Sequence, residues 1–174
     1  DGTSWTEAAD LGVAKYALAT FGSTTSALTA SGYDGDVAEG LSGYTKNVES
    51  WNGSSWSETT DVNNVRGYLG ASGPSNSSGI IYGGLYTAYV DSTPPRTTKT
   101  ESWDGTSWTE VNDLANASEA NAGSGSGTST SAIIAAQYTG SLTTNSEQWD
   151  FPPPTAAILT EGSIFLSGGK SLKG

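Results

Sequence analysis

One ten-residue phrase occurs three times in this chain at nearly constant spacing. It reads DGTSWTEAAD from Asp1, NGSSWSETTD from Asn52 and DGTSWTEVND from Asp104, which are offsets of 51 and 52 residues. A related tag, NVESW, KTESW or NSEQW, occupies residues 47–51, 99–103 and 145–149. A repeat with a period of about 50 residues indicates units that stack on one another and bury their faces between them.

Each repeat is predicted to form four short strands. The segment ending in Trp51 has an extended pattern, Asn52-Gly53 supplies a tight turn, and Ser-Trp-Ser-Glu resumes the extended pattern, which indicates a hairpin. Two further strands are expected at the Gly- and Ala-rich stretches 67–73 and 120–126 and at the apolar stretches 27–28, 79–82 and 132–135. Because no window carries a helical stripe, the sequence predicts an all-β fold.

Four antiparallel strands in about 50 residues are typical of a kelch-like β-propeller blade. We therefore expect about three blades, at residues 1–50, 51–102 and 103–150. A propeller normally has roughly four to eight blades, so three need further repeats or further copies to close a ring. The fourth copy of the phrase fails at Phe151-Pro152-Pro153-Pro154, and residues 151–174 are predicted to be a Pro-rich linker and a short C-terminal segment.

The middle repeat resembles a kelch motif. It carries the pair Gly83-Gly84, the segment Glu101-Ser102-Trp103-Asp104, Trp108 and the strand entry Asp113-Leu114. The other repeats depart from the motif, because Ser31-Gly32 and Ala136-Gln137 stand in place of the Gly pair. Trp also replaces the Tyr that is more usual in kelch blades.

The phrase W-[DN]-G-[ST]-S-W-[ST]-E is similar to repeats in virion proteins of marine tailed bacteriophages, including those of cyanobacteria. The resemblance covers residues 1–150. It implies a non-enzymatic tail fibre, head fibre or appendage protein on the virion surface. The partners it implies are other virion proteins or further copies of the chain, and a glycan or protein of the host surface. The expected role is adhesion to the host or decoration of the particle.

Positions that recur in every unit are predicted to be structural. Trp residues at one place in each unit bury the faces between stacked blades, with sugar stacking as the alternative. Gly residues allow the tight turns, and carboxylates cap turns or accept backbone N–H groups. These positions are Trp5, Trp51, Trp56, Trp103, Trp108 and Trp149; Gly2, Gly53 and Gly105; and Asp10, Asp61 and Asp113.

Composition excludes several function classes. Seven basic residues against 18 acidic ones give a net charge of −11, so nucleic acids and anionic membranes would repel the chain. No apolar run is long enough for membrane insertion. With no His and no Cys, the chain lacks imidazole bases, thiol nucleophiles and zinc ligands of those types. Because an active site is usually built once from unlike residues, the repeated carboxylates do not suggest catalysis.

The segments between strands differ from repeat to repeat, and such loops carry binding functions on rigid scaffolds. The middle one, residues 85–98, contains Tyr86, Tyr89 and Arg96, which are the predicted binding residues. Asp34, Asp36 and Glu39 lie in a less repetitive stretch and are candidate Ca²⁺ ligands, with a solvated loop as the alternative. No other cofactor is predicted.

Two other functions compete with the virion hypothesis. A kelch-like interaction module of a bacterial surface or secreted protein would share the same repeats. A glycan-processing enzyme would instead depend on a carboxylate outside the repeats, such as Asp36 or Glu39. A copper radical oxidase of the kelch class ranks lower still, because no histidine ligand exists.

Overall fold

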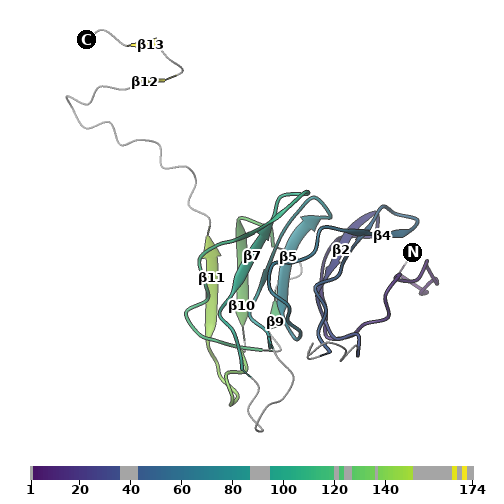
Figure 1. Ribbon diagram of the computed structural model, residues 1–174, viewed down its shortest axis with the longest axis horizontal. Coiled ribbons are helices and arrows are strands. Elements are labelled where there is room, and N and C mark those ends of the chain that lie inside the picture. The colour runs from purple at the N-terminus through teal and green to yellow at the C-terminus, as the bar shows by residue number, and fades with distance from the viewer. Residues whose placement is uncertain are drawn as a thin grey trace.

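In the computed structural model, antiparallel strands are arranged in sheets (Figure 1). The structure describes residues 2–35, 43–86, 95–119, 122–123, 127–135, 137–150, 166–167 and 170–171. Sheet 1 contains β1 (Ala19–Ser23), β2 (Ser26–Ala30), β3 (Val48–Trp51) and β4 (Trp56–Thr59). Sheet 2 contains β5 (Gly70–Ser75), β6 (Ser78–Tyr82), β7 (Thr100–Trp103) and β8 (Trp108–Glu110).

Sheet 3, as described, contains β9 (Ala122–Gly123), β10 (Ser131–Ala135) and β11 (Ser146–Asp150). Its strand order is β11-β10-β9. A separate short pair is formed by β12 (Leu166–Ser167) and β13 (Lys170–Ser171). The described residues include no helix long and apolar enough to cross a membrane. These observations confirm the predicted all-β class, and sheets 1 and 2 have the predicted four antiparallel strands.

The repeated phrase forms the hairpin that closes a sheet. Trp51 pairs with Trp56 across β3 and β4, and Trp103 pairs with Trp108 across β7 and β8. The turn is held by a side chain, because Asp104 Oδ1 accepts the backbone N–H groups of Thr106 and Ser107 at 2.8 Å each. The hydrogen bonds from Ser107 and Thr106 lower the pKa of Asp104 to about 2.

Asn52 makes the equivalent turn contacts in sheet 1, and Gly53 and Gly105 follow at φ of 97° and 98°, where only Gly is unstrained. The phrase that begins one sequence repeat therefore supplies the last strand of the preceding sheet.

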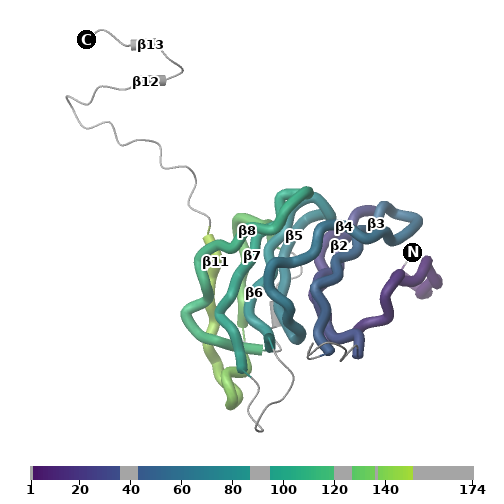
Figure 2. Tube along the Cα trace, in the orientation of Figure 1, coloured from purple at the N-terminus to yellow at the C-terminus, as the bar shows by residue number. Residues whose placement is uncertain are grey.

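The sheets stack face to face, with sheet 2 between the other two (Figures 1 and 2). Alternation along β6 divides its side chains between two cores. Ile81 belongs to the core shared with sheet 1, which also contains Leu28 and Trp103, whereas Ile80 and Tyr82 belong to the core shared with Ile134 of sheet 3. Burial raises the pKa of Tyr82 to about 12. Each sheet thus depends on its neighbour to cover one face.

The close approach of sheets 1 and 2 depends on one aromatic ring. A Cβ atom added at Gly79 would lie 2.2 Å from Cε2 of Phe21. Gly79 lies opposite Trp103, and the matching positions opposite Trp51 and Trp149 are Ala27 and Ala132. At Gly79 the ring of Phe21 occupies the space that the methyl group of an alanine would take.

We predict that Gly79→Ala lowers the free energy of unfolding by about 1–3 kcal/mol, the usual cost of overpacking a core. The same substitution made in a Phe21→Ala background should cost much less, because the ring it meets is gone. Chemical denaturation of the four proteins of this double-mutant cycle measures the coupling. Additive effects of the two substitutions would contradict this account of the packing.

Candidate functional site

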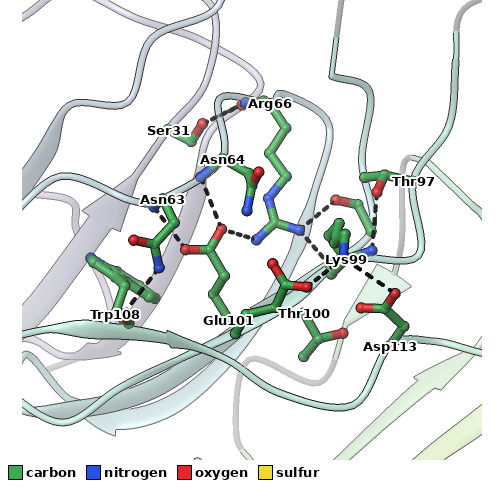
Figure 3. A network of polar contacts seen from close by, with 12 residues as sticks. Ser31, Asn63, Asn64, Arg66, Thr97, Lys99, Thr100, Glu101, Trp108 and Asp113 are labelled. Carbon is green, nitrogen blue, oxygen red and sulfur yellow. Dashed lines mark hydrogen bonds and ion pairs between the residues drawn. The ribbon is translucent and has the colours of Figure 1, made fainter.

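A buried carboxylate joins the connector between sheets 1 and 2 to the strand β7. Glu101 is fully buried, and its carboxylate accepts the backbone N–H groups of Asn63 at 2.8 Å and Asn64 at 3.3 Å (Figure 3). Asn63 and Asn64 lie in the connector, outside any strand, so their amides have no ladder partner. The carboxylate supplies an acceptor for two adjacent amides that no strand pairs.

The same contact occurs in each sheet. Glu49 of β3 accepts the amides of Gly12 at 2.6 Å and Val13 at 3.2 Å. Glu147 of β11 accepts the amides of Ala115 at 2.7 Å and Asn116 at 3.2 Å. Glu49, Glu101 and Glu147 are hereafter called the connector carboxylates. Desolvation alone would raise the pKa of Glu147, but hydrogen bonds from Gln137, Ala115 and Asn116 hold it below its usual value.

The side chain that contacts each connector carboxylate differs between sheets. In sheet 2 it is Arg66, which is fully buried and lies 2.8 Å from Glu101. The Nη1 atom of Arg66 also donates to the carbonyls of Gly83 and Lys99, whereas its buried Nε has no hydrogen-bond partner among the described residues.

In sheet 1, Lys15 lies 3.6 Å from Glu49 and donates to Asn47 Oδ1 at 2.7 Å. Desolvation lowers the pKa of Lys15 despite the attraction of Glu49. In sheet 3 the neutral amide of Gln137 donates to Glu147 at 3.0 Å. The contact with two backbone amides is therefore the same in each sheet, while the side chain that contacts the carboxylate varies.

A cavity of about 510 Å³ opens beside Arg66. Its size is ordinary for a small-ligand site. Three chain segments line it: the β4–β5 connector with Asn63, Asn64 and Arg66, the β2–β3 connector with Lys46, and the β6–β7 connector with Tyr86, Thr97 and Lys99. The cavity thus lies where segments that differ between repeats meet on a scaffold of repeated strands.

The cavity lining offers hydrogen-bond donors, one aromatic ring and positive charge. Lys99 pairs with Glu110 and lies 3.7 Å from Asp113, and the hydrogen bond to Glu110 raises the pKa of Lys99. Lys46 is exposed and forms no ion pair with any described carboxylate. Lys46 and the exposed Tyr86 are therefore the side chains best placed to bind a hydroxyl-rich or acidic ligand.

The predicted binding residues are in different environments. Tyr86 is 46% exposed and lines the cavity. Tyr89 lies outside the described residues. Arg96 is held 2.6 Å from Glu119, with its guanidinium 4.9 Å from the centre of the Tyr138 ring. The structure therefore brings Tyr86 to the cavity, whereas Arg96 joins the β6–β7 connector to segments that flank β9 and β10.

The predicted calcium ligands cannot be assembled from the described residues. Asp34 is half-buried, and Asp36 and Glu39 lie outside the residues that the structure describes. No group of three or more acidic side chains suited to a metal ion occurs in the described part of the chain. The calcium site stays a prediction.

The repeated Trp residues are mainly engaged in packing. Trp51, Trp103 and Trp108 are buried, Trp56 and Trp149 are half-buried, and Trp5 is fully exposed. The indole N–H groups of Trp51, Trp103 and Trp149 donate to the turn carbonyls of Thr24, Asn76 and Ser129 at 2.8–3.1 Å. Trp103 and Trp108 also pack against each other, with ring centres 5.0 Å apart and the ring planes tilted by 37°.

Glu110 and Asp113, near the end of the third copy of the phrase, contact side chains instead of backbone N–H groups among the described residues. Asp113 accepts from the hydroxyl of Thr98 at 3.2 Å, and Glu110 binds Lys99. The role predicted for these residues, accepting backbone N–H groups, is played in the connectors by Glu49, Glu101 and Glu147. The signal for those three was present in the tags NVESW, KTESW and NSEQW, which place an acidic residue two positions before Trp.

A scan of protein-family models and a search of curated proteins gave no match to this chain. Among solved structures, that of YjhT superposes with a TM-score of 0.59 at 16% sequence identity. The superposition covers 79% of this chain and 43% of the YjhT chain, so this chain spans less than half of that protein. This similarity supports the all-β architecture of stacked sheets.

We predict unequal costs for removing two connector carboxylates. Glu101→Ala leaves buried Arg66 without its counter-ion and should lower the free energy of unfolding by about 3–5 kcal/mol. Glu147→Ala removes the same kind of backbone contact, but from exposed amides beside a neutral Gln137, and should cost about 0.5–1.5 kcal/mol. Urea denaturation of both variants makes the comparison, with Arg66→Met in the Glu101→Ala background expected to recover part of the loss. Equal losses in the two variants would contradict the role assigned to Arg66.

Proposed function

We propose that this chain is a non-enzymatic structural component of a bacteriophage virion, a fibre or appendage protein that attaches to the host surface or decorates the particle. The observation that carries this proposal is the repeated phrase W-[DN]-G-[ST]-S-W-[ST]-E, which forms identical hairpins in sheets 1 and 2. These hairpins make a regular scaffold, and the dissimilar connectors meet at the cavity beside Arg66.

The finer architecture in this proposal is a kelch-like β-propeller in which each sheet is a blade. Face-to-face stacking of sheets with a constant hairpin and a constant connector carboxylate supports it. About three blades per chain require other virion proteins or further copies of the chain to complete a ring. The surface that meets the host would carry Lys46 and Tyr86, and its target would be a surface glycan or protein.

The role of the carboxylates supports a function without catalysis. Glu49, Glu101 and Glu147 are each occupied by two backbone N–H groups, and Glu101 is also neutralised by Arg66. Each of these carboxylates holds a connector in place, which is a structural task. Weak contacts repeated over many copies on a particle would supply binding strength by multivalency instead.

A kelch-like interaction module of a bacterial surface or secreted protein is the second candidate. The same scaffold and the same cavity serve it equally well. The two hypotheses differ in where the chain is found, on a virion or on a bacterial surface.

The proposal predicts that cryo-EM of purified virions shows this stack of sheets on the particle, with the cavity between sheets 1 and 2 facing outward. Particles carrying Lys46→Ala with Tyr86→Ala should then adsorb to host cells roughly tenfold more slowly, a loss equivalent to about 1.4 kcal/mol. Leu142→Ala is the matched control, because Leu142 is 92% exposed and does not line the cavity.

Absence of the chain from purified particles would contradict the virion role. Unchanged adsorption of the double variant, with the chain present on the particle, would contradict the binding role of the cavity.

A further inference from the structure

Among the described residues, the outer edge of sheet 3 has no counterpart of the strand that closes sheets 1 and 2. In sheets 1 and 2 the strand carrying the tag pairs with a fourth strand, β4 or β8. Its counterpart β11 pairs only with β10 among the described residues. The sequence after Asp150 is Phe-Pro-Pro-Pro, and residues 151–174 contain no Trp. Proline has no N–H to donate to a ladder, so the following segment does not repeat the sequence of β4 and β8.

The sequence of the missing strand is present at the other end of the stack. Residues 4–7 read Ser-Trp-Thr-Glu, and β8 begins Trp-Thr-Glu. Residues 2–10 form no strand and are exposed throughout, and Trp5 is 102% exposed. Its counterpart Trp108 is 6% exposed. An amphipathic strand sequence with an indole in solvent is therefore found in the same molecule as a sheet edge that fits it.

We propose that residues 5–7 of a second copy of this chain add to the edge of β11 as an antiparallel fourth strand. The register follows from the two complete sheets, in which Trp51 pairs with Trp56 and Trp103 with Trp108. Applied to sheet 3, it places Trp5 of the second copy opposite Trp149, Thr6 opposite Gln148 and Glu7 opposite Glu147. This strand addition gives the backbone of β11 a ladder on both sides.

Residues 5–7 of the same copy do not reach the edge of β11, because they belong to the segment held at the far side of the stack. Gly12 and Val13 are bound by Glu49 of sheet 1, and sheet 2 lies between sheets 1 and 3 (Figure 1). In the chain itself, the connector that follows β4, the closing strand of sheet 1, leads into β5 of the next stacked sheet. Repetition of this step places sheet 1 of the second copy on the outer face of sheet 3.

The exposure of Ile133 supports this stacking. Ile133 of sheet 3 is 52% exposed, whereas its counterparts by register, Leu28 in sheet 1 and Ile80 in sheet 2, are 0% exposed because the next sheet covers them. The proposed second copy covers Ile133 in the same way.

The environments of Trp108 and Trp56 also support the proposed strand addition. Trp108 donates from Nε1 to the carbonyl of Thr60 at 3.0 Å, just after the closing strand of the preceding sheet. Ala9 occupies the same place in its copy of the phrase as Thr60 does, 51 residues later. By this correspondence, the carbonyl of Ala9 is the acceptor expected for the indole of Trp56. Trp56 is half-buried, and residues 2–10 are exposed. Seating residues 5–7 on a neighbouring sheet 3 brings Ala9 to the indole of Trp56.

Paired cysteines test the proposed register, because the chain has no natural cysteine. Directly opposite residues in an antiparallel pair have the spacing that a disulfide needs. Thr6→Cys with Gln148→Cys places the two thiols opposite each other on different copies, and both native side chains are exposed. The matched control is Glu7→Cys with Gln148→Cys, which moves one thiol to the opposite face of the strand.

On mild oxidation, the first pair should give disulfide-linked species of two or more chains, and the control should stay largely unlinked. Trp5→Ala in the cysteine-free chain should also shift the mass measured by light scattering toward the monomer. Failure of the first pair to link, equal linking of both pairs, or a disulfide within one chain would overturn the proposal. The test needs neither virion nor host, so its failure leaves the attachment role standing, and loss of the attachment role leaves this assembly standing.

Discussion

The hydrogen bonds that the connector carboxylates accept are the contacts on which the stack depends. After each sheet closes, the chain must cross to the next sheet, and the crossing segment has no ladder for its amides. Glu101 solves this problem for Asn63 and Asn64 from inside the fold, at 0% exposure. Glu49 and Glu147 do the same for their connectors. Because each carboxylate accepts two adjacent amides, it ties its connector to the strand that carries it.

The junction between sheets 1 and 2 differs from that between sheets 2 and 3 in the side chain that contacts the connector carboxylate, which is Arg66 in the first and Gln137 in the second. A buried charge needs a counter-charge, and sheet 2 provides Arg66, whose side chain reaches from the connector to the carbonyls of Gly83 and Lys99. The same arginine lines the cavity that Lys46 and Tyr86 border. The scaffold and the candidate binding site therefore share a side chain, which links the geometry of the cavity to the stability of the connector.

Local signals in the sequence are sufficient to predict the hairpins but not the contacts of the connectors. Asn52-Gly53 and Asp104-Gly105 predict turns because the side-chain acceptor and the left-handed glycine act within four residues. The apolar stretch at 79–82 predicts a buried strand, and β6 is that strand. The partners of Glu101 lie 35–38 residues away, and no local pattern shows that Arg66 faces it. Arg96 was predicted to bind a ligand, but its contacts with Glu119 and Tyr138 also depend on the fold.

Hydrogen exchange at the connector amides, measured by NMR, tests the central claim most directly. The account predicts that the amides of Asn63 and Asn64 exchange as slowly as those of β7, although they belong to no strand. It also predicts that Glu101→Ala releases these two amides more than the amides of β7. Exchange of Asn63 and Asn64 at the rate of an unprotected peptide in the native chain would contradict it.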